Sequence, residues 1–205
     1  MSKSGCDFAL GELTSECGTS LAKGVVKAYF INRADATVAF GPTGTDYNVI
    51  TSITLATGAK AVLVNDYRTE RFADTAKGSA SGVYGGEFSK TFSFNFRNVS
   101  ILGAQDVDAL AKNPDGWIVI LQRDKSLGSA AFEVFGAMSP MRVADNGVAA
   151  NYGVNDDTQN SPIITFNCTE DYYGVFFNCA AGTATEAEAY AANLAAVTAL
   201  LTAAE

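Results

Sequence analysis

The stretch at residues 87–98, EFSKTFSFNFRN, is the clearest fold signal in this sequence. Because side chains alternate across a strand, residues of one parity share a face. One face carries Phe88, Phe92, Phe94 and Phe96, and the other carries Ser89, Thr91, Ser93, Asn95 and Arg97. The aromatic face predicts a buried core. The polar face is open to three interpretations: it contacts solvent, a ligand or another copy of the chain.

Further strands are predicted by runs rich in β-branched and aromatic residues. We expect them at residues 24–33, 49–57, 59–67, 117–122, 131–136 and 163–171. Gly58 separates the second and third of these, and a strand, a tight turn and a strand predict an antiparallel hairpin. Residues 40–48 indicate a turn region, and residues 172–179 an aromatic strand or turn. Residues 138–162 are expected to be irregular, with at most short strands around Met141–Val143.

Residues 100–113 change from a strand period to a helical one. Val107, Leu110 and Ala111 share one face of the predicted helix. Asp106 and Asp108 fit first-turn acids better than a catalytic pair, because carboxylates stabilise the positive end of the helix dipole. The sequence NPDG at residues 113–116 then ends the helix.

A second helix is predicted for the Ala-rich residues 185–205. Thr185 and Glu188 have the T-x-x-E spacing of a capping box. An apolar stripe follows, made of Tyr190, Leu194, Val197, Leu200 and Leu201. Such a stripe packs against the helix's own domain or against a neighbouring molecule.

Residues 68–86 have no clear period and are predicted to form a long loop, which in a compact domain is usually functional or ordered by a partner. Its candidate subunit contacts are Arg68, Arg71, Phe72, Lys77 and Tyr84, and its basic residues can pair with acids of another copy. We therefore expect an N-terminal arm at residues 1–23, a β domain at 24–178 and a helical extension at 179–205. The fold class is mainly β with flanking helices (α+β), as a β-sandwich or a partly closed barrel.

The charge is unevenly distributed. The net charge is −8, yet residues 1–125 are balanced, whereas residues 126–205 hold nine acids and one base, Arg142. An acidic surface repels the phosphate backbone, which argues against a conventional nucleic-acid-binding protein. The charge serves solubility or, alternatively, forms a surface that nucleic acid passes without adhering.

The four cysteines, Cys6, Cys17, Cys168 and Cys179, do not have zinc-ligand spacing. The N-terminus lacks the apolar run of a signal peptide, so we expect buried free thiols, with Cys6–Cys17 and Cys168–Cys179 bridges as the alternative. No segment is apolar for long enough to predict a membrane span.

The motifs of common catalytic sites are missing from the sequence. It contains no histidine, no G-x-S-x-G and no P-loop. Asp156–Asp157 and Glu170–Asp171 fit solvated turns better than a calcium site, and Trp117 fits core packing better than ligand stacking. We expect no enzyme, no metal and no cofactor, and an assembly or binding protein instead.

The order of these segments resembles the tail tube (major tail) proteins of tailed bacteriophages, particularly those of phages and prophages of Bacteroidetes-type hosts. The resemblance covers most of residues 6–178. It includes KGVVKAYFINRADAT, VITSITLATGAKAVLV, KTFSFNFRN followed by GAQDVDALAKNPDGWIVIL, AFEVFG and SPIITFNCTEDYYGVFF. The Ala-rich helix after Cys179 departs from the usual ending of the family.

The resemblance implies a virion structural protein that is assembled in the bacterial cytoplasm. Subunits would form stacked, hexameric rings whose inner strands join into a continuous barrel. The tube would hold the tape-measure protein, meet tail-end or terminator proteins and, in a contractile tail, a sheath. DNA would pass through without specific binding to a lumen that is usually acidic. Residues 68–86 become a candidate ring-to-ring connector, and the polar face from Ser89 to Arg97 a candidate barrel wall.

Two other classes remain open at this point. One is a different virion component, such as a capsid decoration or head–tail connector protein. The other is a carbohydrate-binding or adhesin module, which clustered Trp and Tyr residues on one exposed face would favour. A cation-dependent hydrolase that uses Asp clusters is the least supported class.

Overall fold

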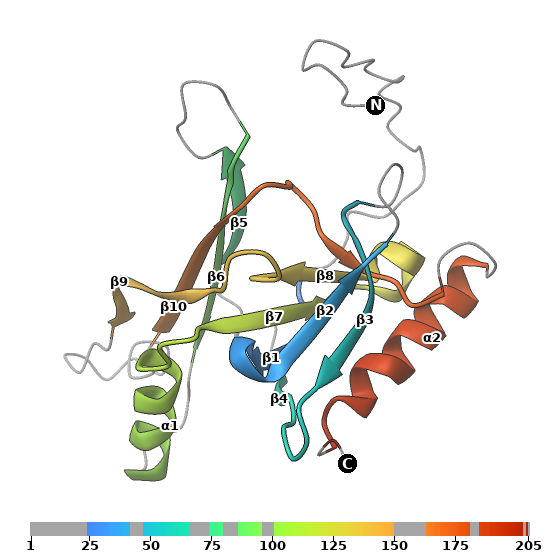
Figure 1. Cartoon of the computed structure of the whole chain (residues 1–205). Coiled ribbons are helices and arrows are strands. Elements are labelled where there is room, and N and C mark those ends of the chain that lie inside the picture. The colour runs from blue at the N-terminus through green and yellow to red at the C-terminus, as the bar shows by residue number, and fades with distance from the viewer. Residues whose placement is uncertain are drawn as a thin grey trace.

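The computed structural model describes residues 24–41, 47–65, 74–79, 86–95, 101–149, 163–180, 185–202 and 204. These residues form two β-sheets and two α-helices (Figure 1). The seven-stranded sheet has the order β2 (Ala36–Phe40), β3 (Val49–Leu55), β11 (Phe176–Phe177), β8 (Phe132–Phe135), β7 (Trp117–Gln122), β1 (Lys27–Asn32) and β4 (Val62–Asn65). The four-stranded sheet has the order β5 (Asp74–Ser79), β6 (Phe88–Asn95), β10 (Ile163–Glu170) and β9 (Arg142–Ala149). Neither sheet closes on itself, and the predicted mainly β fold with flanking helices is confirmed.

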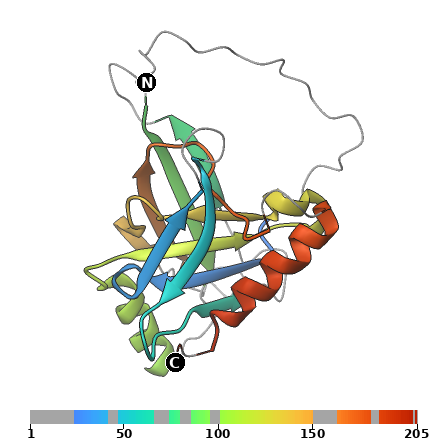
Figure 2. The ribbon, with the colours of Figure 1, turned by 45° about the vertical axis from the view of Figure 1, so that its right-hand side comes forward.

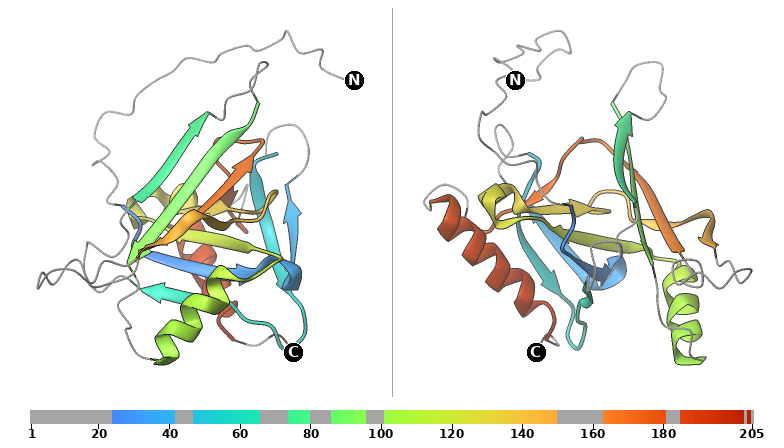
Figure 3. Two further views of the ribbon diagram at one scale, coloured as in Figure 1. Left: turned by 90° about the vertical axis from the view of Figure 1, so that its left-hand side faces the viewer. Right: turned by 180° about the vertical axis from the view of Figure 1, so that it is seen from behind.

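The seven-stranded sheet is the middle of three layers. The four-stranded sheet covers one face of it, and α2 (Glu186–Ala199) crosses the other (Figures 2 and 3). Strand β7 has apolar residues on both of these covered faces. Ile118 and Ile120 face the α2 side, whereas Val119 and Leu121 face the four-stranded sheet. A strand that is buried on both faces needs apolar residues at both parities, and this explains the continuous run WIVIL.

The core between the sheets is aromatic. Phe92 and Phe94 of β6 are fully buried, and both rings lie beside Phe30 of β1, with centroids 6.0 and 5.7 Å away. Phe166 of β10 completes the cluster at 5.3 Å from Phe30. The aromatic parity of the opening stretch therefore does point into the core, as predicted. Phe96 lies outside the described residues.

Both predicted helices form, but one detail of the first is wrong. Helix α1 spans Ile101–Ala111, with no acid in its first turn. Asp106 lies in the middle of the helix, and Asp108 forms an exposed i,i+4 ion pair with Lys112 at 3.0 Å. The Trp117 indole N–H donates to the Leu110 carbonyl at 3.0 Å and holds the end of the helix against the core.

Helix α2 has the predicted capping box. The Glu188 N–H donates to Thr185 Oγ1 at 3.4 Å, and the Thr185 N–H donates to Glu188 Oε2 at 2.9 Å. The predicted stripe packs against the chain's own seven-stranded sheet, where Val197 is fully buried. The C-terminal end of the helix is held by backbone bonds, among them Ala61 N to Leu200 O at 2.7 Å.

The predicted hairpin around Gly58 is wrong. Strand β3 pairs with β2 and β11, whereas β4 pairs with β1 at the far edge of the sheet. The connection between β3 and β4 runs along the end of α2, where the Gly58 N–H donates to Ala204 O at 2.8 Å. The sequence of the turn suits a hairpin, but contacts with the C-terminal residues determine the path of the chain.

Three strands differ from the prediction. The predicted loop at residues 68–86 contains β5, the strand β2 at Ala36–Phe40 is not among those predicted, and β9 covers Arg142–Ala149 where only short strands are expected. Strand β5 has the sequence DTAKGS, which lacks the β-branched and aromatic residues that indicate a strand. Its pairing with β6, and not its own propensity, makes it a strand.

Candidate assembly surface

On the outer side of the four-stranded sheet, small and uncharged residues occupy the middle of β5, β6 and β10, whereas Asp74 lies opposite Ser93 and the exposed Arg142 lies opposite Asn167 in the register. In register across β5, β6 and β10 lie Ala76, Thr91 and Asn167, and beside them Gly78, Ser89 and Thr169. Ser93 and Thr165 extend the face at one end. We call these eight residues the outer face. They have the parity opposite to that of Phe92 and Phe94, as the sequence predicts.

This face is partly exposed. Ala76, Gly78, Asn167 and Thr169 are exposed, and Ser89 and Thr91 are half-buried. Ser93 is 5% exposed, and its hydroxyl shares a 2.9 Å hydrogen bond with that of Thr165. Cross-strand hydroxyl pairs of this kind stabilise a sheet by roughly 0.2–1 kcal/mol. The face is therefore a layer of hydroxyl, amide and small apolar groups.

Several of the sequence-predicted residues have no described side chain. Asn95 pairs with Ile163 through the backbone register, but its side chain lies outside the described residues, as does all of Arg97. Arg68, Arg71, Phe72 and Tyr84 also lie outside the described residues. Ser89, Thr91 and Ser93 do share one face, and their role as a barrel wall stays a prediction.

Both edges of the four-stranded sheet end in a strand with one described neighbour. Strand β5 is regular and pairs with β6 over six positions. Strand β9 is irregular: its register against β10 shifts between Ile164 and Phe166, so that residues 144–147 bulge out opposite Thr165. Unpaired strand edges are sites at which another chain can add a strand, and bulges hinder such pairing. The β5 edge is therefore the more available of the two.

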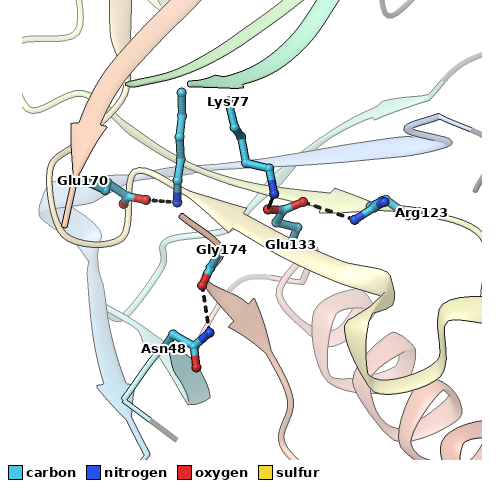
Figure 4. Close-up of polar contacts among 7 residues, drawn as sticks. Asn48, Lys77, Arg123, Glu133, Glu170 and Gly174 are labelled. Carbon is cyan, nitrogen blue, oxygen red and sulfur yellow. Dashed lines mark hydrogen bonds and ion pairs between the residues drawn. The ribbon is translucent and has the colours of Figure 1, made fainter. Parts of the chain in front are cut away.

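The inner face of the same sheet carries a lysine that the sequence analysis overlooks. Lys90 has the parity of Phe88 and Phe92, and its side chain is fully buried. Its ammonium forms an ion pair with the Glu170 carboxylate (Figure 4), which is also fully buried. The same carboxylate accepts a 3.1 Å hydrogen bond from the Met138 N–H. Each residue lies within an apolar parity series, and that is the signal by which the sequence could reveal the pair.

A second ionic group joins the two sheets. Lys77 of β5 contacts Glu133 of β8 at 2.5 Å, and Arg123 contacts the other oxygen of the same carboxylate at 3.3 Å (Figure 4). The Tyr173 ring lies over the Lys77 ammonium at 4.2 Å. Lys77 is therefore bound within its own chain, and its side chain is only 19% exposed. A pairing of Lys77 with an acid of another copy would have to replace these contacts.

These ion pairs also change the interpretation of the acidic C-terminal part. Glu133 and Glu170 are two of its nine acids, and both are neutralised inside the molecule. Glu186 accepts a hydrogen bond from the Ser129 N–H at 2.6 Å, which holds the pKa of that carboxyl below its ordinary value. The surface of this region is thus less acidic than the count of residues indicates.

The two cysteines that the structure describes are free. Cys168 is buried beside the Lys90–Glu170 pair, and burial raises the pKa of its thiol to about 12, with a further increase from Glu170. Cys179 is exposed, so the expectation of buried thiols fails there, and its Sγ lies 3.3 Å from Asn193 Oδ1. Cys6 and Cys17 lie outside the described residues.

No group of three or more His, Cys, Asp or Glu residues converges on a metal-binding geometry within the described part of the chain. Within the same residues, no helix is both long and apolar enough to cross a membrane. Comparisons with protein-family models, curated proteins and solved structures found no match to this chain.

Proposed function

We propose that this chain is a structural subunit that assembles into the tail tube of a bacteriophage. The observation that carries the proposal is the four-stranded antiparallel sheet, which combines a regular edge strand that has one described neighbour with an outer face whose central positions are small and uncharged, between Asp74 and Arg142. The sequence resemblance to tail tube proteins leads to the same class. Small side chains allow close approach of a neighbour or of a passing polymer without adhesion.

The strand directions support a closed ring. Strand β5 is antiparallel to β6, β6 to β10, and β10 to β9, so the two edge strands run in opposite directions. When copies are related by rotation about a ring axis, β9 of one copy meets β5 of the next copy in the antiparallel sense, through the residues of β9 on either side of its bulge. The antiparallel pairing of strands then continues from one copy to the next. A head-to-tail contact of this kind generates a closed ring if the rotation between successive copies adds up to a full turn.

The remaining expectations belong to this proposal. Copies of the chain would be its main partner, with the tape-measure protein inside the tube, terminator proteins at its ends and a sheath around it in a contractile tail. DNA would pass through in transit. The assembled protein would be located in the virion tail.

Two glycine substitutions test the edge contact. A Cβ at Gly78 or at Gly24 would meet nothing within 4 Å, so both sites tolerate a side chain. Gly78 lies on β5 and on the outer face, whereas Gly24 precedes β1 of the other sheet. Gly78→Lys should abolish assembly, and Gly24→Lys should leave it intact. Equal assembly of the two variants, measured by sedimentation, contradicts the edge contact.

A carbohydrate-binding module is the second candidate. Its support is a group of tyrosines on the chain: Tyr47 packs on Tyr172 at 4.8 Å, and Tyr173 packs edge-on against Phe88 at 5.6 Å. Tyr47 and Tyr173 are 48% and 56% exposed. Binding to a glycan array that is lost in Tyr173→Ala, together with a monomeric state at high concentration, would favour this candidate.

A further inference from the structure

The bulge of edge strand β9 contains the one Asn-Gly dipeptide of the chain, Asn146–Gly147. The register against β10 places Val143 opposite Phe166 and Val148 opposite Ile164, so the intervening residues 144–147 have no register partner. Asn146 is exposed and has a φ of 57°, in the left-handed region. Its carboxamide makes no hydrogen bond to any residue that the structure describes.

Glycine is required at the next position. A Cβ on Gly147 would lie 2.6 Å from the carbonyl oxygen of Thr165 and 2.7 Å from that of Ala144. The fold therefore needs the glycine for its close backbone approach. Gly147 is itself buried against backbone atoms, but because glycine has no side chain, no Cβ branches beside the backbone nitrogen that follows Asn146. A glycine amide nitrogen beside an asparagine carboxamide that has no hydrogen bond to the described residues favours attack of this nitrogen on the carboxamide carbon.

We propose that Asn146 is a site of spontaneous deamidation. The Gly147 backbone nitrogen attacks Asn146 Cγ, a C–N bond forms, and the Cγ–Nδ2 bond breaks. Ammonia leaves with the proton of the Gly147 amide, and a cyclic imide remains. Water then opens the imide at either carbonyl, which gives aspartate or isoaspartate at this position. The reaction needs water alone and no oxidant, reductant or cofactor.

The product changes the edge of the four-stranded sheet. A new carboxylate appears next to the exposed Asp145, and two like charges then lie side by side on β9. In the isoaspartate form the main chain also gains a methylene group within the bulge. Under the proposed function, which pairs β9 with β5 of a neighbour, the modified edge is a poorer partner. This second consequence rests on that function, whereas the reaction itself does not.

The test is peptide mapping by mass spectrometry of the folded full-length chain during incubation at neutral and at alkaline pH. The peptide with Asn146 should show the mass gain for exchange of an amide nitrogen by oxygen, faster at alkaline pH because the attacking nitrogen must lose its proton. Asn48 and Asn178, followed by Val49 and Cys179, serve as internal controls. Conversion of Asn146 no faster than that of both controls overturns the proposal.

Two variants complete the test. In Asn146→Gly, glycine still suits the left-handed backbone, but the reacting carboxamide is removed. The mass gain of this peptide should therefore disappear. Asn146→Asp reproduces the charge of one product and should slow assembly relative to Asn146→Gly. If the unchanged chain shows the mass gain but Asn146→Gly and Asn146→Asp assemble equally well, Asn146 is deamidated and the proposed contact of β9 with a neighbouring subunit is wrong.

Discussion

Lys90 of β6 and Glu170 of β10 form an ion pair in which both side chains are fully buried. The Phe135 ring lies 5.1 Å from the ammonium, and the second carboxylate oxygen accepts the Met138 N–H. A buried ion pair is weak evidence for stability, because two charges have lost their hydration. The pair instead links β6 and β10 to β8 and to the residue Met138 that follows it, through the Phe135 contact and the Met138 N–H.

Removal of one partner of this pair should destabilise the fold strongly. Lys90→Met leaves Glu170 as an unpaired buried charge, and we expect the free energy of unfolding in urea to fall by about 3–5 kcal/mol. The double variant Lys90→Met/Glu170→Leu should recover most of the loss. Lys112→Met, which breaks the exposed pair with Asp108, is the control and should cost about 0.3–0.5 kcal/mol. Equal losses for Lys90→Met and Lys112→Met would contradict the assignment.

The capping box should make a measurable contribution to α2. Thr185→Ala removes the acceptor for the Glu188 N–H, and we expect the free energy of unfolding to fall by about 0.5–2 kcal/mol. Thr198→Ala is the matched control, because the exposed Thr198 hydroxyl donates only to the Leu194 carbonyl of its own helix. A loss at Thr185 no larger than that at Thr198 would show that the cap is not formed in solution.

The two described cysteines should differ in reactivity. Cys179 is exposed, whereas Cys168 is 8% exposed and its thiol pKa is raised to about 12. Because the thiolate is the reactive form, iodoacetamide should label Cys179 in the folded protein and Cys168 only after unfolding. Peptide mapping distinguishes both from Cys6 and Cys17. Rapid labelling of Cys168 in the folded chain would be incompatible with its burial.

The same thiol should make stability depend on alkaline pH. An unfolded Cys168 ionises near its ordinary pKa of 9.0, and the folded one only near about 12. Its contribution is therefore fully present below pH 9.0 and is lost as the pH rises toward 12, at no more than about 1.4 kcal/mol per pH unit. Urea unfolding should show a shallower alkaline decline in Cys168→Ala than in the unchanged chain. Identical slopes would mean that the folded thiol titrates normally.

The elements with a strong local pattern could be predicted from the sequence. The aromatic parity of β6, the alternation of β10 and the continuous run of β7 each report how many faces of a strand are buried. The capping box of α2 is likewise a local signal. The helix cap depends on residues that are close in the sequence, and the strand patterns depend on which faces are buried. Both can therefore be predicted from the residue types at successive positions.

The features that could not be predicted depend on distant partners. Strand β5 is polar and is held by β6 and by the Lys77–Glu133 contact. The position of β4 beside β1 follows from contacts of residues 58–61 with the end of α2. Of the candidate surface, the shared face of Ser89, Thr91 and Ser93 followed from parity. The neighbours that complete it, Ala76 and Asn167, required the pairing of three strands.

The most direct test of the central claim is the state of the purified, unmodified chain at high concentration. Sedimentation velocity, combined with negative-stain microscopy of the same sample, measures the size and shape of the particles. The tube proposal predicts rings or tubes with a central channel. A single monomeric species at all concentrations, with no ring in the images, would contradict it.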